Sequence, residues 1–289
     1  MRDQLAPGKP VVDQPEHTES AHDGRLLIGL DIDGTIMTYD EFVSSEVKSA
    51  IAALRERGHH VVLSTGRPLV ATLPVLAELG IDTGYAVCSN GSVTARLDPE
   101  LPGGFEVDHA VMFPAEPAVA ALGKFIPESL IALEQIGIGY YISEEFHSRK
   151  LHGAHTITAL PQMRQMETAR VVVARAQHAS REFSDYVAQL GLRDTYYTVA
   201  DEHWMDLAPQ GITKAYGMER LRALLEVAPE RTVAVGDSEN DIEMLEWAHL
   251  GVAMGHAEAS VIAAADSITL PIIDDGLAPV LEALLIPVH

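Results

Sequence analysis

A short apolar run that ends in two carboxylates constrains the fold of this chain more than any other feature. Residues 26–30, Leu-Leu-Ile-Gly-Leu, have the length of one buried strand, and residues 31–35, Asp-Ile-Asp-Gly-Thr, follow directly. In an open α/β sheet, ligands bind outside the carboxyl ends of the strands. The two acids are therefore expected where such a fold carries out chemistry. There they can hold a cation such as Mg2+, or one can attack an electrophile while the other moves protons.

This motif has two other interpretations besides a catalytic one. An Asp-Gly pair after a strand often forms only a turn, and a single short motif leaves that alternative open. A calcium loop of the EF-hand type also begins Asp-x-Asp, but it needs its glycine at the sixth position and a helix upstream. Here Gly34 is fourth and a strand pattern precedes, so the calcium loop is rejected.

Three further motifs follow along the chain. Residues 61–68, Val-Val-Leu-Ser-Thr-Gly-Arg-Pro, form an apolar run that ends in a hydroxyl, a glycine and an arginine. Lys214 closes the segment Gln-Gly-Ile-Thr-Lys, and a third apolar run, residues 232–235, ends in Gly-Asp-Ser-Glu-Asn-Asp at 236–241. Together the four motifs resemble, in order, those of the haloacid dehalogenase superfamily of phosphohydrolases. The Cof-type branch, with DxDGT, TGR, a lone Lys and GDxxND, is the closest match, and the resemblance covers nearly the whole chain after residue 24.

The two aspartates of the first motif are the candidate catalytic residues. Asp31 is placed to attack a phosphoryl group and form an aspartyl phosphate, a known kind of covalent intermediate. Asp33 would protonate the leaving oxygen and then take a proton from the attacking water. This division requires different protonation states, which the proximity of like charges favours. The resemblance assigns the same two roles to the first and second aspartate.

A metal site is implied by the resemblance. Its ligands would be Asp31, the backbone carbonyl of Asp33, and Asp237, around a Mg2+ ion that prefers octahedral oxygen coordination and offsets repulsion between carboxylate and phosphate. The alternative for Asp237 is an N-cap of the following helix, for which Asp241 is better placed. Asp241 could also support the metal from behind its ligands.

Four residues are candidate phosphate ligands. Thr65 and Gly66 would use a hydroxyl and a backbone N–H near a helix start, where anion sites form easily; alternatively, Thr65 caps the helix from residue 69. Lys214 would neutralise phosphate charge in the transition state. A lone lysine is usually a solvated surface residue, and only the order of the motifs argues otherwise. The resemblance supports Asn240 as a further donor.

Several residues near the motifs keep two interpretations. Arg67 matches the arginine that is frequent in the family motif, but it could equally pair with a surface acid. Asn90 and Gly91 match a recurrent Asn-Gly at the edge of the family site, or form a simple turn. His256 stands where the family often has asparagine, a departure that leaves the four motifs intact.

The fold class indicated is α/β: a doubly wound parallel sheet with an inserted α+β domain. Short apolar runs alternate with helical stretches at both ends of the chain, which is typical of a parallel sheet. The predicted strands are residues 26–30, 61–64, 85–88, 233–235, 250–254 and 267–270. The predicted helices are residues 45–57, 69–79, 215–225, 242–248, 257–265 and 277–285.

The predicted domains are a catalytic core, residues 25–96 and 207–289, and an insertion, residues 97–206. The insertion begins after a Pro/Gly-rich segment, residues 99–104, which is predicted to be a hinge. Within it the pattern predicts strands at residues 138–142, 169–174, 195–199 and 203–207 and a helix at 181–190. The resemblance implies that it is an α+β cap of type C2 over the active site. Its basic residues either contact the substrate or lie in a solvated loop: His147, Arg149, Lys150, His152 and His155.

Charge limits the partners of this chain. Its formal net charge of -22, from 20 basic and 42 acidic residues, argues against nucleic acid and against an anionic membrane surface, and requires a phosphate site to be locally positive. Cys88 is the only cysteine, so no intrachain disulfide is expected. Residues 1–24 are expected to be a disordered tail without the apolar segment of a signal peptide. A cytoplasmic protein follows as the default.

The function predicted is a Mg2+-dependent phosphatase of small phosphorylated metabolites, most plausibly sugar phosphates. One alternative is a phosphotransferase similar to phosphomannomutases, which return the phosphoryl group to a sugar. Another is a phosphosugar-binding regulator without turnover, which the intact catalytic positions disfavour. Specificity is expected to reside in the inserted residues.

Overall fold

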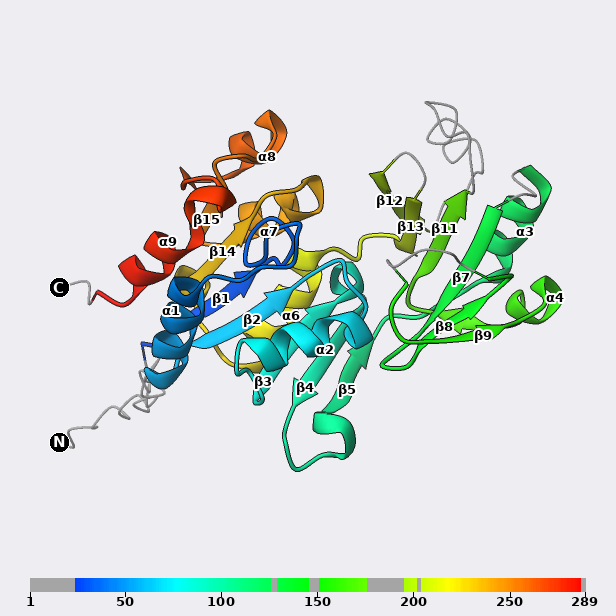
Figure 1. Ribbon diagram of the computed structural model, residues 1–289, viewed down its shortest axis with the longest axis horizontal. Coiled ribbons are helices and arrows are strands. Elements are labelled where there is room, and N and C mark those ends of the chain that lie inside the picture. The colour runs from blue at the N-terminus through cyan, green and yellow to red at the C-terminus, as the bar shows by residue number, and fades with distance from the viewer. Residues whose placement is uncertain (1–23, 126–128, 146–150, 176–194, 202–203, 287–289) are drawn as a thin grey trace, which may run out of the picture.

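The chain forms two sheets, one in a core and one in an inserted domain (Figure 1). The computed structural model describes residues 24–125, 129–145, 151–175, 195–201 and 204–286. The predicted tail at residues 1–24 therefore lies outside the described residues except for Gly24, as does the predicted helix at 181–190. Among the described residues, no helix is both long enough and apolar enough to cross a membrane.

The core sheet has eight strands in the order β16-β15-β14-β1-β2-β3-β4-β5. The six strands from β16 to β3 are parallel, and β4 and β5 continue the sheet as an antiparallel edge. This confirms the predicted doubly wound parallel sheet. The strands are β1 (Leu27–Leu30), β2 (His60–Ser64), β3 (Gly84–Cys88), β4 (Val93–Leu97), β5 (Phe105–Ala110), β14 (Thr232–Gly236), β15 (Leu250–Ala253) and β16 (Ser267–Ile268).

Helices cover both faces of this sheet (Figure 1). One face packs against α1 (Ser45–Glu56), α2 (Leu69–Glu78) and α9 (Leu277–Leu284). The other packs against α6 (Lys214–Leu224), α7 (Ile242–Trp247) and α8 (Ala259–Ala264). In α1, the Ser44 side chain accepts a hydrogen bond from the Val47 N–H, and the buried residues recur at helical spacing. These elements match the predicted ones closely because each carries its own periodicity and end signals.

The strand order places the site. The chain winds outward from β1 through β2 and β3 on one side, and through β14, β15 and β16 on the other. The order therefore reverses between β1 and β14, and the carboxyl ends of these two strands meet there, where α/β sheets bind ligands. The Asp31 N–H donates to the Val235 carbonyl at 3.1 Å across this junction.

The inserted domain is a second α+β unit. Its six-stranded sheet has the order β12-β13-β11-β7-β8-β9, and β6 (Phe113–Pro114) pairs separately with β10 (Glu167–Thr168). Helices α3 (Glu116–Phe125) and α4 (Leu160–Met163) pack on one face of the large sheet. Its strands are β7 (Ser129–Gln135), β8 (Gly139–Ile142), β9 (Ala154–Ile157), β11 (Val171–Arg175), β12 (Thr195–Asp201) and β13 (Trp204–Pro209).

The strand pairing corrects both predicted boundaries of this insertion. Strand β5 pairs with β4 in the core sheet, so the first boundary moves from residue 97 to beyond Ala110. Residues 99–104 are the turn of the β4–β5 hairpin and not a hinge. Strand β13 belongs to the inserted sheet, so the second boundary moves from 207 to after Pro209. Sheet membership depends on distant partners, which the composition of a loop does not indicate.

Candidate active site

The first motif turns sharply at the end of β1. Asp31 is buried at the strand end, and Gly34 in the following turn has a φ of +83°. A Cβ atom at Gly34 would overlap the carboxylate of Asp237 from the GDxxND motif. Glycine is therefore required here both by the backbone conformation and by the close approach of the two motifs.

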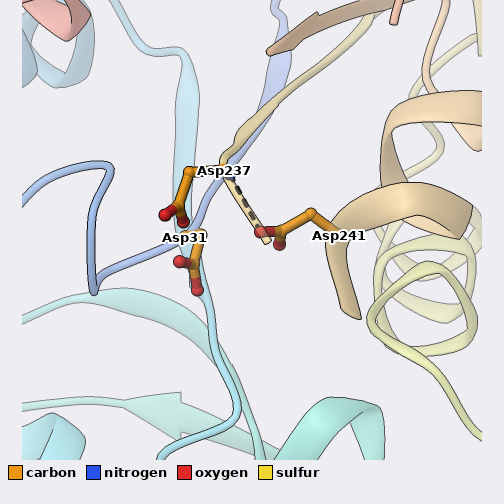
Figure 2. A group of neighbouring side chains, drawn as sticks. All are labelled: Asp31, Asp237 and Asp241. Carbon is orange, nitrogen blue, oxygen red and sulfur yellow. Dashed lines mark hydrogen bonds between the residues drawn. The ribbon is translucent and has the colours of Figure 1, made fainter. Parts of the chain in front are cut away.

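Three aspartates meet at the switch between β1 and β14. One carboxylate oxygen from each of Asp31, Asp237 and Asp241 lies within 4.8 Å of the others (Figure 2). Asp241 Oδ2 accepts hydrogen bonds from the backbone N–H groups of Asp237 and Ser238, each at 3.1 Å. Asp241 thus fixes the turn that presents Asp237.

Lys214 lies under this cluster and not on the surface. Its Nζ atom donates to Asp31 Oδ1 and to Asp241 Oδ1, each at 2.6 Å, and its side chain is 1% exposed. Burial lowers the pKa of Lys214, but the Asp241 and Asp31 carboxylates raise it by more than burial lowers it, so the net change is upward. The ammonium group therefore stays charged beneath the two carboxylates.

The cluster fits a divalent cation. Burial and the neighbouring Asp241 raise the pKa of Asp31 and of Asp237, so more positive charge is needed to hold both ionised. Asp237 Oδ1 is buried with no hydrogen-bond partner among the described residues. A buried carboxylate oxygen without a hydrogen-bond partner is expected where that oxygen binds a metal ion. Both carboxylate oxygens of Asp241 already accept hydrogen bonds, so Asp241 is better suited to hold Asp237 and Lys214 in place than to bind an ion itself.

Two residues that sequence analysis did not place in this site contact Asp237. Tyr39 donates its hydroxyl to Asp237 Oδ2 at 3.1 Å, and burial together with that carboxylate raises the pKa of Tyr39 to about 12. His256 Nε2 lies 3.4 Å from the same oxygen. His256, which stands where the family often has asparagine, thus contacts the acidic cluster. Tyr39 lies in no motif, so the sequence held no signal that could have identified it.

Arg67 resolves the choice that the sequence left open. Its Nε donates to Asp33 Oδ2 at 2.8 Å and its Nη2 to Asp33 Oδ1 at 2.5 Å. The two parallel bonds form a bidentate pair, the strongest arrangement for guanidinium and carboxylate. The Asp33 carboxylate is held beside the cavity, apart from the three clustered aspartates.

Three of the four candidate phosphate residues, Thr65, Gly66 and Asn240, lie together at the surface of one cavity. Asn240 Nδ2 donates to Asn90 Oδ1 at 3.0 Å, and Gly66 lies against both amides. The Thr65 hydroxyl accepts from the Arg67 N–H at 3.1 Å, and Pro68 is the N-cap of α2. The alternative interpretation of Thr65 as the helix cap is therefore wrong.

Asn90 and Gly91 are more than a turn. Gly91 has a φ of +97°, and a Cβ atom there would overlap the carbonyl of Thr213, the residue before Lys214. The Asn90 N–H donates to the Thr65 carbonyl at 3.0 Å. This loop thus packs the second motif against the third.

A cavity of about 910 Å³ opens over these groups. The core supplies most of its lining, and the inserted domain supplies His152, Arg170 and Asp206. Of the predicted basic cluster, His155 is exposed, and His147, Arg149 and Lys150 lie outside the described residues. Arg170 and Asp206 were missed, although a single acid between buried Met205 and Leu207 is a signal that could have shown Asp206.

Comparison with known proteins decides the family. The sequence pattern of the haloacid dehalogenase-like hydrolases matches residues 28–102 and 131–281, more than half of the chain. This chain belongs to that family. Membership confirms the resemblance seen in the four motifs and makes the chain a phosphoric monoester hydrolase of the Cof branch.

Several relatives of this haloacid dehalogenase-like hydrolase are named as phosphatases. The 5-amino-6-(5-phospho-D-ribitylamino)uracil phosphatase YitU of Bacillus subtilis strain 168 is 26% identical over 89% of this chain and 96% of its own length. The pyridoxal phosphate phosphatase YbhA of Escherichia coli K12 is 28% identical over 90% and 98%. The solved structure of the subclass IIB sugar phosphatase BT4131 superposes with a TM-score of 0.74 at 22% identity, over 90% of this chain and 100% of its own. The last likeness shows a shared fold.

Proposed function

We propose that this hydrolase is a Mg2+-dependent phosphatase that releases phosphate from sugar phosphates through an aspartyl phosphate on Asp31. The observation that carries the proposal is the position of Asp31. It is buried between Lys214 and Asp237 at the floor of a cavity of about 910 Å³, a volume suited to a small-molecule substrate.

Asp31 is the proposed nucleophile. Lys214 holds its Oδ1 atom, and the carboxylate attacks phosphorus so that a P–O bond to Asp31 forms while the P–O bond to the leaving alcohol breaks. Water then attacks phosphorus, the bond to Asp31 breaks, and inorganic phosphate leaves.

Asp33 is the proposed proton carrier. It gives a proton to the leaving oxygen in the first step and takes one from water in the second, which returns it to its starting state. Paired with Arg67, its carboxylate accepts two hydrogen bonds, as suits the base of the second step. In the first step a protonated Asp33 would keep one oxygen on Arg67 and donate its proton from the other to the leaving oxygen.

The acidic cluster is the proposed Mg2+ site. Asp31, Asp237 and the backbone carbonyl of Asp33 would hold the ion, and Asp241 would brace Asp237 and Lys214 behind them. When bound, the ion offsets the repulsion between carboxylate and phosphate. The orphaned, buried Asp237 Oδ1 atom supports this proposal.

The proposed phosphate contacts are the Thr65 hydroxyl, the Gly66 N–H, the Asn240 amide and the Lys214 ammonium. Thr65, Gly66 and Asn240 line the cavity together, and Lys214 lies directly against Asp31, which also lines it; both observations support this proposal. Preorganised donors of this kind stabilise charge that develops in the transition state. Lys214 is charged and pinned before substrate arrives, so it requires no rearrangement.

Sugar phosphates are the proposed substrates. The structural relative BT4131 is described as a sugar phosphatase, and YitU is named for a phosphorylated ribityl compound. The cavity of this chain is rich in carboxylates, amides and guanidinium groups, which suits a leaving group that carries hydroxyls.

Phosphate release from a panel of sugar phosphates, with Mg2+ and with a chelator, tests this function. The wild type should release phosphate only with the metal, Asp31→Asn should release none, and Asp40→Asn, a change at an exposed neighbouring acid, should match the wild type. Acid-quenched mass spectrometry should find a phosphoryl adduct on the peptide that contains Asp31. Metal-independent release, or release by Asp31→Asn, would overturn the proposal; less phosphate than alcohol would show transfer to a sugar instead.

A further inference from the structure

One face of the inserted sheet carries charged residues at core-like depth. Val172 of β11 pairs with Ala132 of β7 and with Asp206 of β13, so these three share a face. Because strand residues alternate between faces, Glu134 and Arg170, each two positions away, share it too. The opposite face is apolar and packs on α3 and α4 through Leu133, Val171, Val173, Met205 and Leu207. The charged face is thus the one that α3 and α4 do not cover, and it contacts the core through Glu134.

Arg170 and Asp206 form a buried ion pair on this face. The Arg170 Nη2 atom lies 2.5 Å from Asp206 Oδ2, and the two side chains are 8% and 10% exposed. The Tyr140 hydroxyl lies 3.4 Å from Arg170 Nη1, and the Nε atom of Arg170 is buried without a hydrogen-bond partner among the described residues. Burying an ion pair is costly, and an unsatisfied guanidinium nitrogen adds to that cost.

This costly pair lines the cavity that contains Asp31. Arg170 and Asp206 are both lining residues, as are Asp31 and Asp237. A donor and an acceptor from the inserted domain therefore line the same cavity as the proposed nucleophile. A role for the pair in substrate binding accounts for its retention where an apolar pair would be more stable.

The charges around the cavity indicate which substituents a substrate can carry there. Among the described lining residues, the two arginines are each paired with a carboxylate, Arg67 with Asp33 and Arg170 with Asp206. Burial and then Arg67 lower the pKa of His152, which leaves it neutral at pH 7. Further acids line the cavity: Glu41, Glu239 and Glu258. A second anionic group on the substrate would thus meet paired cations and free acids, whereas a hydroxyl both accepts from a guanidinium and donates to a carboxylate.

We propose that Arg170 and Asp206 are the specificity-determining pair of the inserted domain, binding neighbouring hydroxyls of the leaving group and disfavouring a second anionic group. The inference rests on the proposed phosphatase function. It adds which residues bind the leaving group and which charge that group should carry. Arg170 donates to one hydroxyl and Asp206 accepts from the next. The pair is neutral as a whole, so it attracts no second anion.

A contact between the two domains links the face that carries this pair to the candidate phosphate residues. Ser89, which precedes Asn90, donates its hydroxyl to Glu134 Oε2 at 2.6 Å, and both residues are buried. Ser89 has a φ of +50°, a conformation that costs a non-glycine residue energy. Glu134 shares the sheet face with Arg170, so the contact joins this face of the inserted domain to the loop that contains Asn90.

Three six-carbon phosphate esters test the inference by kcat/KM. Sorbitol 6-phosphate carries hydroxyls along its chain, n-hexyl phosphate carries none, and 6-phosphogluconate replaces the terminal alcohol of sorbitol 6-phosphate with a carboxylate. The wild type should prefer sorbitol 6-phosphate over the other two by at least about tenfold, the scale of losing one hydrogen bond to a charged group. Arg170→Gln and Asp206→Asn should each reduce the preference over n-hexyl phosphate about tenfold or more.

The two variants should act in opposite directions on the anionic substrate. Asp206→Asn removes a negative charge from the cavity lining and should raise the ratio of 6-phosphogluconate to sorbitol 6-phosphate, whereas Arg170→Gln removes a positive charge and should lower it. A merely structural role would move both ratios alike. Arg164→Gln is the matched control, because Arg164 lies in the same domain in an exposed pair with Glu116, 3.8 Å away, and its ratios should equal those of the wild type.

Two safeguards keep the outcome decisive. If a single variant fails to fold by circular dichroism, Arg170→Met with Asp206→Leu replaces the whole ion pair with apolar side chains; its preference for sorbitol 6-phosphate over n-hexyl phosphate should still fall. Equal effects of all changes on all three substrates, or a wild type without preference, would overturn the inference. A wild type that releases phosphate from none of these esters, nor from p-nitrophenyl phosphate with Mg2+, would overturn the proposed function itself.

Discussion

The ammonium group of Lys214 lies 2.6 Å from a carboxylate oxygen of Asp31, and each side chain is more than nine-tenths buried. Asp241 lies at the same distance on the other side of the ammonium. Burial penalises each charge alone, and the pairing compensates only while all three groups are present. The proposed nucleophile and the fold around it thus share one electrostatic unit.

Removing Lys214 should therefore damage both catalysis and stability. Lys214→Met should lower kcat about 100-fold or more, the scale for one preorganised charge partner. It should also reduce the free energy of unfolding by about 3–5 kcal/mol, because two buried carboxylates lose their cation. Lys48→Met removes an exposed lysine that pairs with Glu78 at 2.8 Å and should cost less than about 1 kcal/mol. Urea unfolding that gives equal losses for both variants would refute the buried triad.

Mg2+ should stabilise the wild-type protein against heat. The raised pKa values of Asp31 and Asp237 mean that ionising both in the apo protein is unfavourable, and a bound cation removes that penalty. Asp237→Asn should lose most of the Mg2+-induced rise in Tm, whereas Asp40→Asn should keep it. Differential scanning calorimetry with and without Mg2+ measures this without any substrate. A full Mg2+ shift in Asp237→Asn would exclude Asp237 as a ligand.

Arg67 should matter most for substrates with poor leaving groups. Arg67→Gln frees the Asp33 carboxylate from its bidentate partner, and a misplaced general acid costs about 10²-fold or more when the leaving oxygen needs a proton. The kcat/KM for n-hexyl phosphate should therefore fall much further than that for p-nitrophenyl phosphate, whose leaving group departs without protonation. Asp33→Asn should show the same pattern. Equal losses on both esters in Arg67→Gln would disconnect Arg67 from proton transfer.

Glu134 should make stability depend on pH. Burial raises the pKa of Glu134 above its ordinary value, despite opposing effects of Arg170 and of the Ser89 hydrogen bond. A raised folded-state pKa means that the folded protein binds this proton more tightly, so the contribution is greatest below the unfolded pKa and is lost as pH rises through the folded pKa. Glu134→Gln keeps an oxygen for Ser89 but cannot ionise, so its Tm should fall less than that of the wild type between pH 4.5 and pH 8. Parallel Tm profiles for the two proteins would contradict the raised pKa.

The sequence alone determined the parts of this protein whose signals are local. Apolar runs a few residues long ended in the motif residues, and the spacing of its apolar residues predicted α1 to within a residue of its bounds. The alternation of strands and helices specified a parallel sheet, and its strand ends necessarily brought the motifs to one edge. Asp31 and Asp237 could be proposed because each directly follows such a strand, and Lys214 because of the order of the four motifs.

Only the tertiary structure decided which groups pair across long stretches of chain. Arg67 meets Asp33 across 34 residues, Arg170 meets Asp206 across 36, and Lys214 meets Asp31 across 183. Propensity and periodicity act over a few residues, whereas these contacts depend on strand order, register and the burial that two packed sheets create. The same reason explains why β5 joined the core sheet and why a lysine that reads as a surface residue is buried. Pairing in space, and the dielectric environment that sets each charge, are properties of the packed fold.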